Sequence, residues 1–168
     1  MYFCIIESDL KMKYLNKTFI YSQILSGTSE KIFPLLCPTK EYEWIAPWKC
    51  EMIHSHSGFA ELNCVFTTHF PDEVKETWFI DQYIPNRLIQ FIRFSELTII
   101  KHSIELTDNQ NGTTNATWSQ TFFPLNEEGN NFVQNYSEDE YIEEIKTLEK
   151  MLNHYLVTNK CLEISKIQ

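Results

Sequence analysis

The chain has 168 residues, 43% of them hydrophobic, which favours a single domain with a core large enough to fold unaided. With 14 Lys and Arg against 23 Asp and Glu, its formal net charge of -9 would repel a phosphate backbone, so we expect no nucleic-acid partner. The five cysteines have no CxxC spacing and do not resemble a secreted disulfide framework, which predicts reduced thiols and a cytoplasmic location.

The first residues are apolar, but Glu7 and Asp9 interrupt them at once. This segment has no basic region before the apolar run and is too short to cross a bilayer, so it predicts neither a signal peptide nor an integral membrane segment. We expect residues 1–12 to form an N-terminal extension, residues 13–160 a single domain and residues 161–168 a tail.

A long strand and two short helices are expected at the start of the domain. Residues 13–26 alternate in polarity and are rich in β-forming side chains, which predicts the strand. Pro34 and Pro38 then limit helix length, because neither has an N–H to donate and each crowds the preceding turn. The pattern therefore predicts helices over residues 28–36 and 38–45, with a break between them.

From Trp48 onward, the apolar side chains recur with a period of two. Short turns separate the runs, and consecutive strands joined by tight turns pair antiparallel. Residues 48–124 therefore predict a meander of six strands, and the first strand makes seven. After the first hairpin, the strands are expected over residues 76–84, 87–94, 97–107 and 113–123.

A long amphipathic helix is expected over residues 137–156. Ser137 and Glu140 have the spacing of a capping box, which marks the helix start. Apolar residues then recur every three or four positions and form a stripe that requires a partner surface, for which the sheet is the obvious candidate. Members of this stripe include Tyr141, Ile145, Leu148 and Leu152.

Several motifs follow the same order as the elements. They are Thr28–Pro38, Glu41–Trp44, Trp48, Thr77–Phe79 with Tyr83 and Pro85, and Gly112–Thr114 leading to Trp118. With these motifs, the chain resembles the START-like superfamily, also called SRPBCC or Bet v 1-like, which includes polyketide cyclase and dehydrase relatives. The resemblance implies an α+β helix-grip fold (β-αα-β6-α), in which a seven-stranded antiparallel sheet wraps around the C-terminal helix. It also implies a cavity between sheet and helix for lipids, hormones, polyketides or other apolar molecules.

If the even-numbered positions of the later strands face inward, they line this cavity together with residues of the first hairpin and the last helix. The predicted ligand-binding residues are Trp48, Met52, His54, Phe66, Trp78, Ile80, Gln82, Ile92, His102, Trp118, Gln120, Tyr141, Ile145, Leu148 and Leu152. Alternatively, the polar members are satisfied by each other, by backbone or by buried water, or a register slip of one residue turns them to solvent. Trp44 and Trp48 are expected to anchor the short helices against the sheet.

Catalysis and metal binding have weaker support in the sequence. No GxSxG, HExxH or Cys/His signature occurs, and His102 with Glu105 is the best remaining acid–base candidate, against the plain reading of a strand histidine and a solvated acid. The spacing of Cys50, His54 and Cys64 matches no zinc pattern, so we expect no metal and no cofactor.

Three functions follow from these observations. The first is a carrier or sensor that binds a small apolar or amphipathic molecule. The second is an enzyme of the cyclase, dehydrase or hydrolase kind that uses a cavity histidine or acid. The third is an interaction module resembling the activator domains of the Hsp90 chaperone, which would use the outer surface. The sequence leaves the ligand, turnover and oligomeric state open.

Overall fold

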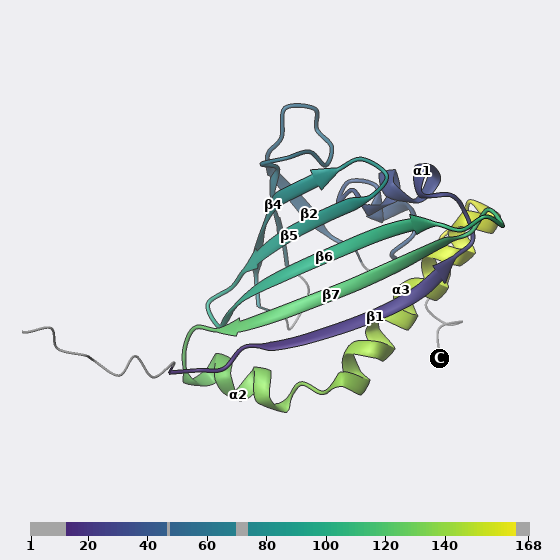
Figure 1. Ribbon diagram of the computed structural model, residues 1–168. Helices are drawn as coiled ribbons and strands as arrows, with labels where there is room; N and C mark the ends of the chain where they lie inside the picture. Colours follow the sequence, from purple (N-terminus) through teal and green to yellow (C-terminus); the bar gives the residue numbers. More distant parts are fainter. Residues whose placement is uncertain (1–12, 47, 70–73, 164–168) are drawn as a thin grey trace, which may run out of the picture.

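The computed structural model describes residues 13–46, 48–69 and 74–163. In these ranges there are one sheet, three α-helices and two 3₁₀ turns, and all of them except helix α2 follow the predicted order (Figure 1). The elements are β1 (Lys17–Leu25), α1 (Ser29–Ile32), η1 (Phe33–Leu36), η2 (Glu41–Glu43), β2 (Cys50–His54), β3 (Val65–Thr68), β4 (Glu76–Ile84), β5 (Leu88–Phe94), β6 (Thr98–Asp108), β7 (Thr114–Pro124), α2 (Glu127–Asn135) and α3 (Glu138–Thr158).

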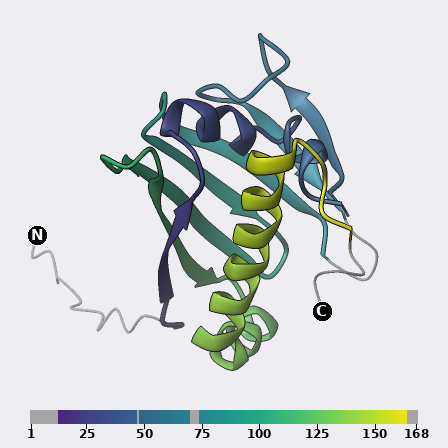
Figure 2. The same ribbon diagram turned by 90° about the vertical axis from the view of Figure 1, so that its right-hand side faces the viewer.

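The seven strands form one antiparallel sheet in the order β1-β7-β6-β5-β4-β3-β2. Strands β2 to β7 are the predicted meander, and β1 pairs with the last strand rather than with its neighbour in sequence. The sheet curves, and α3 lies across its inner face (Figure 2). The predicted α+β helix-grip fold is confirmed.

The capping box at the start of α3 forms as predicted. The Ser137 hydroxyl accepts a hydrogen bond from the Glu140 N–H (3.2 Å), and the Glu140 carboxylate accepts one from the Ser137 N–H (2.7 Å). The helix ends at Asn159, which adopts the left-handed conformation that terminates many helices. Among the described residues, no helix is long and apolar enough to cross a membrane.

The two short helices are shorter than predicted. Residues 28–36 form one turn of α-helix and a 3₁₀ turn, and the second predicted helix is only the 3₁₀ turn η2. The indole N–H groups of Trp44 and Trp48 donate to the carbonyl oxygens of Leu35 and Pro38, each at 2.8 Å. These bonds tie the two tryptophans to the short helical segment, and the Trp48 ring also lies 6.4 Å from that of Trp78 in the sheet.

Helix α2 was not predicted from the sequence. Asn126 caps it by accepting a hydrogen bond from the Gly129 N–H at 2.8 Å, and two acidic residues occupy its first turn. In the sequence, this capping asparagine is the feature from which helix α2 could have been predicted. At Gly129 the helix lies directly against the β5–β6 turn, where a Cβ atom would sit 2.0 Å from the Leu97 carbonyl oxygen.

Replacing Gly129 by alanine is therefore expected to lower the free energy of unfolding by about 2 kcal/mol, because the clash is with backbone and no side-chain rotation relieves it. The measurement is chemical denaturation followed by circular dichroism. Gly27→Ala is the matched control: its Cβ would meet the Leu156 Cδ2 atom at 3.6 Å, an ordinary contact. Equal effects of the two substitutions would contradict the close approach at Gly129.

The predicted inward direction of even-numbered residues is correct for β6 and β7. In both strands these positions are buried except at the last residue, and His102, Trp118 and Gln120 face inward. In β4 it holds as far as Ile80, because a β-bulge separates Ile80 from the next paired residue.

The bulge explains why Gln82 and Ile92 were placed wrongly. Before it, Ile80 pairs with Phe91, and after it Tyr83 pairs with Ile89, so β5 presents its odd-numbered residues inward. Gln82 is exposed, and Ile92 lies on the face opposite Phe91.

A second bulge in β2 accounts for the wrong placement of His54. Between Met52 and His54 the pairing with β3 shifts by one residue, so Met52 opposes Phe66 and His54 opposes Val65. His54 is exposed and lies beside His56.

Candidate functional site

The inner face of the sheet is built from rows of side chains that cross the paired strands. One row runs through Phe19, Gln120, His102, Phe91 and Ile80, which are consecutive partners from β1 to β4. A parallel row contains Phe122, Ile100, Arg93, Trp78 and Phe66. Aromatic side chains therefore dominate the surface that faces α3, with a few polar groups among them.

His102 lies in the middle of this aromatic surface. Its ring centroid is 6.2 Å from that of Trp78, 5.9 Å from Phe91 and 5.6 Å from Trp118. The residue is 6% exposed, and burial together with the nearby charge of Arg93 lowers the pKa of His102 to about 3. His102 is therefore neutral at physiological pH, and no other group among the described residues hydrogen-bonds its Nδ1 atom.

Tyr141 brings a second buried polar atom from α3. Its ring stacks on Phe19 with centroids 5.5 Å apart, and the residue is fully buried. Burial, with a smaller contribution from Glu144, raises the pKa of the Tyr141 hydroxyl, which thus stays protonated. Within the described part of the chain this hydroxyl has no hydrogen-bond partner.

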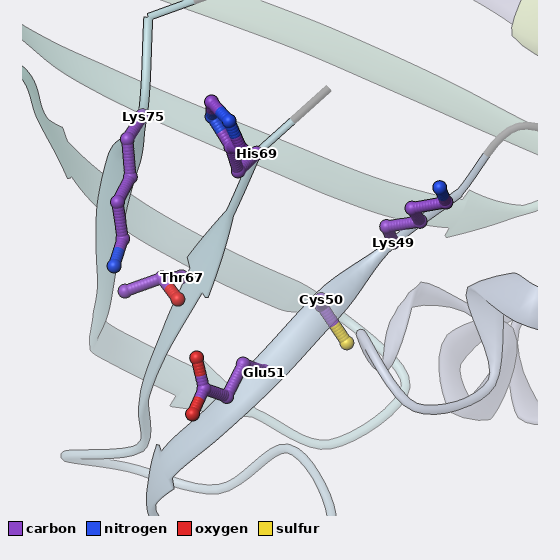
Figure 3. A pocket seen from close by; sticks show the side chains of 6 residues that line it. All are labelled: Lys49, Cys50, Glu51, Thr67, His69 and Lys75. Atoms are coloured by element: carbon purple, nitrogen blue, oxygen red, sulfur yellow. The ribbon is translucent and has the colours of Figure 1, made fainter. Parts of the chain in front are cut away.

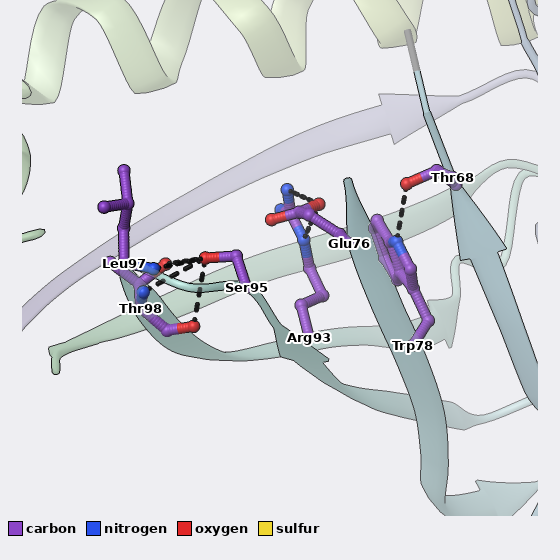
Figure 4. A network of polar contacts seen from close by, with 7 residues as sticks. All are labelled: Thr68, Glu76, Trp78, Arg93, Ser95, Leu97 and Thr98. Carbon is purple, nitrogen blue, oxygen red and sulfur yellow. Dashed lines mark hydrogen bonds and ion pairs between the residues drawn. The ribbon is translucent and has the colours of Figure 1, made fainter. Parts of the chain in front are cut away.

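Arg93 and Glu76 add an ion pair to the inner face (Figure 4). The Glu76 Oε2 atom accepts hydrogen bonds from Arg93 Nη2 (2.6 Å) and Nε (3.0 Å). The guanidinium carbon also lies 4.4 Å from the Trp78 ring centroid, a cation–π geometry. Trp78 is held in turn by a hydrogen bond from its indole N–H to the Thr68 hydroxyl (2.9 Å).

The side of the site near β2 to β4 is less covered than the side near β1. Among the strands, β1 is the one that α3 contacts closely, whereas Trp48, Trp78 and Leu148 are only half-buried. Tyr136 lies on the other side, where its ring packs against Phe19 of β1 and Phe122 of β7, and burial and a hydrogen bond to Glu144 raise the pKa of its hydroxyl.

Twelve of the fifteen predicted site residues belong to the inner face, α3 or the buried core around them. These are Trp48, Met52, Phe66, Trp78, Ile80, His102, Trp118, Gln120, Tyr141, Ile145, Leu148 and Leu152. The sequence interpretation missed Arg93, Glu76 and Gln23. In the orientation that satisfies both ends of its amide, Gln23 accepts a hydrogen bond from Trp118 Nε1 (2.9 Å) and donates one to the Ile145 carbonyl (3.2 Å). It thereby joins β1, β7 and α3.

Two pockets are prominent, and neither lies between the sheet and α3. One, of about 310 Å³, opens at the β2 edge of the sheet, with Lys49, Lys75 and His69 among its lining residues (Figure 3). The other, of about 240 Å³, lies between the short helices and the β4–β5 turn, where Phe33 and Tyr83 line it. The side chains inside the grip instead bury one another.

The other chemical candidates are not assembled. His102 faces inward, whereas Glu105 is exposed on the opposite face of β6, so the two residues considered as an acid–base pair do not meet. Burial raises the pKa of the Cys50 thiol, and it raises the pKa of the Cys64 thiol to about 11, so both thiols are protonated. Within the described ranges, no three His, Cys, Asp or Glu side chains are grouped to hold a metal ion.

The sequence matches no protein-family model and no curated protein. Solved structures are similar in fold. Major latex-like protein 151 from Panax ginseng is 14% identical with a TM-score of 0.64, and the match covers 84% of this chain and 97% of that one. Ara h 8.0201 is 13% identical with a TM-score of 0.61 over 85% and 99% of the two chains. DynU16, from the dynemicin biosynthetic locus, is 11% identical with a TM-score of 0.56 over 85% of this chain and 48% of that one.

Proposed function

Because the chain has the Bet v 1-like (SRPBCC) helix-grip fold, we propose that it binds a small apolar or amphipathic molecule, such as a lipid or polyketide, between the sheet and α3. The observation that carries this proposal is the pair of buried polar atoms, His102 Nδ1 and the Tyr141 hydroxyl, which lack a partner among the described residues. An unpaired buried polar atom costs about 1–3 kcal/mol, and a ligand with a hydroxyl or carbonyl group would recover that cost. The surrounding aromatic rings would supply the apolar contacts.

The ligand would enter from the β2 to β4 side of the grip. Trp48, Trp78 and Leu148 are half-buried there, and α3 leans towards β1. Since the interior is filled by side chains, binding would select a state in which α3 and these side chains are displaced from the inner face. The proposed binding domain comprises residues 13–160.

A carrier or sensor role has more support than an enzymatic one. With a pKa of about 3, His102 carries no proton to donate as an imidazolium at neutral pH, and Glu76 is engaged by Arg93. The location proposed for this carrier is the cytoplasm, where thiols stay reduced, and the free Cys37, Cys50, Cys64 and Cys161 support it.

The first test is native mass spectrometry of the purified protein, followed by organic extraction. We expect an apolar molecule to co-purify and to raise the melting temperature when it is added back to stripped protein. A protein that retains nothing, and whose melting temperature no lipid or aromatic polyketide shifts, would refute the proposal.

Replacing Tyr141 by phenylalanine is expected to raise the free energy of unfolding by about 1 kcal/mol while weakening ligand binding about fivefold. The substitution removes a buried hydroxyl that has no partner in the described part of the protein, but that would hydrogen-bond the ligand. Chemical denaturation and titration of the tryptophan fluorescence measure the two effects.

Tyr136→Phe is the matched control for this prediction. The Tyr136 hydroxyl hydrogen-bonds Glu144, so its removal should lower stability instead. If Tyr141→Phe destabilises the protein as much as Tyr136→Phe does, the Tyr141 hydroxyl is already satisfied and loses its assigned role.

A further inference from the structure

Arg93 supplies a positive charge to the inner face. It is the only charged residue of β5, and it lies in the row next to that of His102. Its guanidinium stacks over Trp78, which also contacts His102, so it borders the proposed ligand site. A guanidinium in such aromatic surroundings is a good partner for the carboxylate of an amphipathic ligand.

Glu76 already occupies this guanidinium. Its Oε2 atom accepts from both Arg93 Nε and Nη2, and the two side chains are only 15% and 19% exposed for Glu76 and Arg93. A charge pair that is this little hydrated is screened weakly, so a second carboxylate beside Arg93 would be repelled by Glu76.

The other ionisable groups at the inner face and at the adjoining end of α2 do not offer an alternative. His102 is neutral. The Lys17 ammonium donates to the Tyr136 carbonyl at 2.6 Å and so caps the C-terminal end of α2. Glu144, which hydrogen-bonds Tyr136, adds negative charge at the same end. The polar groups that a ligand meets are thus the uncharged ones.

From this arrangement we infer that the site selects uncharged molecules bearing hydroxyl, carbonyl or amide groups over carboxylates of the same shape, and that Glu76 sets this selectivity by occupying Arg93. The inference rests on the proposed function, because it concerns the ligand of that same site. It makes Glu76 a specificity-determining residue.

The test compares matched probes that differ only in charge: 2-naphthamide with 2-naphthoate, and decanamide with decanoate. Binding to the full chain is measured by calorimetry at pH 7.5. We expect each amide to bind at least tenfold more tightly than its carboxylate. In Glu76→Gln, which keeps the size of the side chain but removes its charge, carboxylate affinity should rise at least tenfold and amide affinity should change less than threefold.

Glu105→Gln is the control variant, because Glu105 is exposed on the outer face and its charge is remote from the site. It should alter neither affinity. Equal affinity of the wild-type protein for amide and carboxylate, or no gain for carboxylates in a folded Glu76→Gln, overturns the inference and leaves the proposed function standing. Failure of all four probes to bind refutes the proposed function itself.

A second measurement needs no variant. Binding of 2-naphthoate to the wild-type protein should strengthen as the pH falls towards the pKa of the probe, because the protonated acid is uncharged. Binding of 2-naphthamide over the same range corrects for any effect of pH on the protein itself. If 2-naphthoate gains nothing relative to 2-naphthamide, charge selection at this site is excluded.

Discussion

Replacing Trp44 by alanine is expected to lower the free energy of unfolding by about 3–5 kcal/mol. Trp44 has no exposed surface, and its indole N–H donates to the Leu35 carbonyl at 2.8 Å. The substitution therefore creates a cavity under the short helices and leaves that carbonyl unpaired. The measurement is equilibrium denaturation followed by circular dichroism.

Two further variants separate the causes. Trp44→Phe retains most of the buried volume but loses the hydrogen bond to Leu35, and we expect a loss of about 1–2 kcal/mol. Val157→Ala removes apolar atoms from a side chain that is 73% exposed and should stay within about 0.5 kcal/mol of wild type. A cost for Trp44→Ala no larger than that for Trp44→Phe would contradict the packing role of the indole.

The free energy of unfolding is also expected to fall by several kcal/mol as the pH rises from 5 to 8.5. A group contributes about 1.4 kcal/mol for each unit by which its pKa differs between the folded and unfolded states. The cause is Glu41. Although the residue as a whole is only partly buried, its carboxyl group is desolvated, and this raises the pKa of Glu41 from 4.5 to about 8.

The direction follows from linkage. The folded state holds the Glu41 proton more tightly than the unfolded state does, so its contribution is complete below pH 4.5 and is lost as the pH rises through about 8. Glu41→Gln should flatten the stability profile over this range. Glu43→Gln is the control: Lys40 lowers the pKa of Glu43, so its own contribution is lost only at acidic pH and the slope above pH 5 should persist. A Glu41→Gln profile that keeps the wild-type slope would rule out this origin.

Local signals explain why the elements could be predicted from the sequence. Helix α3 could be predicted from its capping box at Ser137 and from its apolar stripe, because both depend only on residues close together in the sequence. The meander is also local, since short turns join its strands. Helix α2 is nine residues long and its apolar stripe is short, so only the N-cap residue Asn126 indicates it in the sequence.

The site was predicted less well because direction depends on register. The bulge after Ile80 reverses the alternation within β4 and so inverts the face of every residue in β5, and a strict period of two cannot anticipate it. Ile92 was therefore chosen where Phe91 and Arg93 face inward. The engagement of Arg93 by Glu76 is a contact between different strands, which single-sequence periodicity does not encode.

The pairing of β1 with β7 also bears on synthesis by the ribosome. Lys17 pairs with Phe122, about a hundred residues later, and at roughly 5–20 residues per second the first strand waits on the order of ten seconds for its partner. During that interval Phe19 and Leu25 have no sheet to pack into, so the nascent chain exposes an unpaired strand with apolar side chains, which chaperones would recognise. Closure of the sheet is thus a late event, set by chain topology and not by the strength of any single contact.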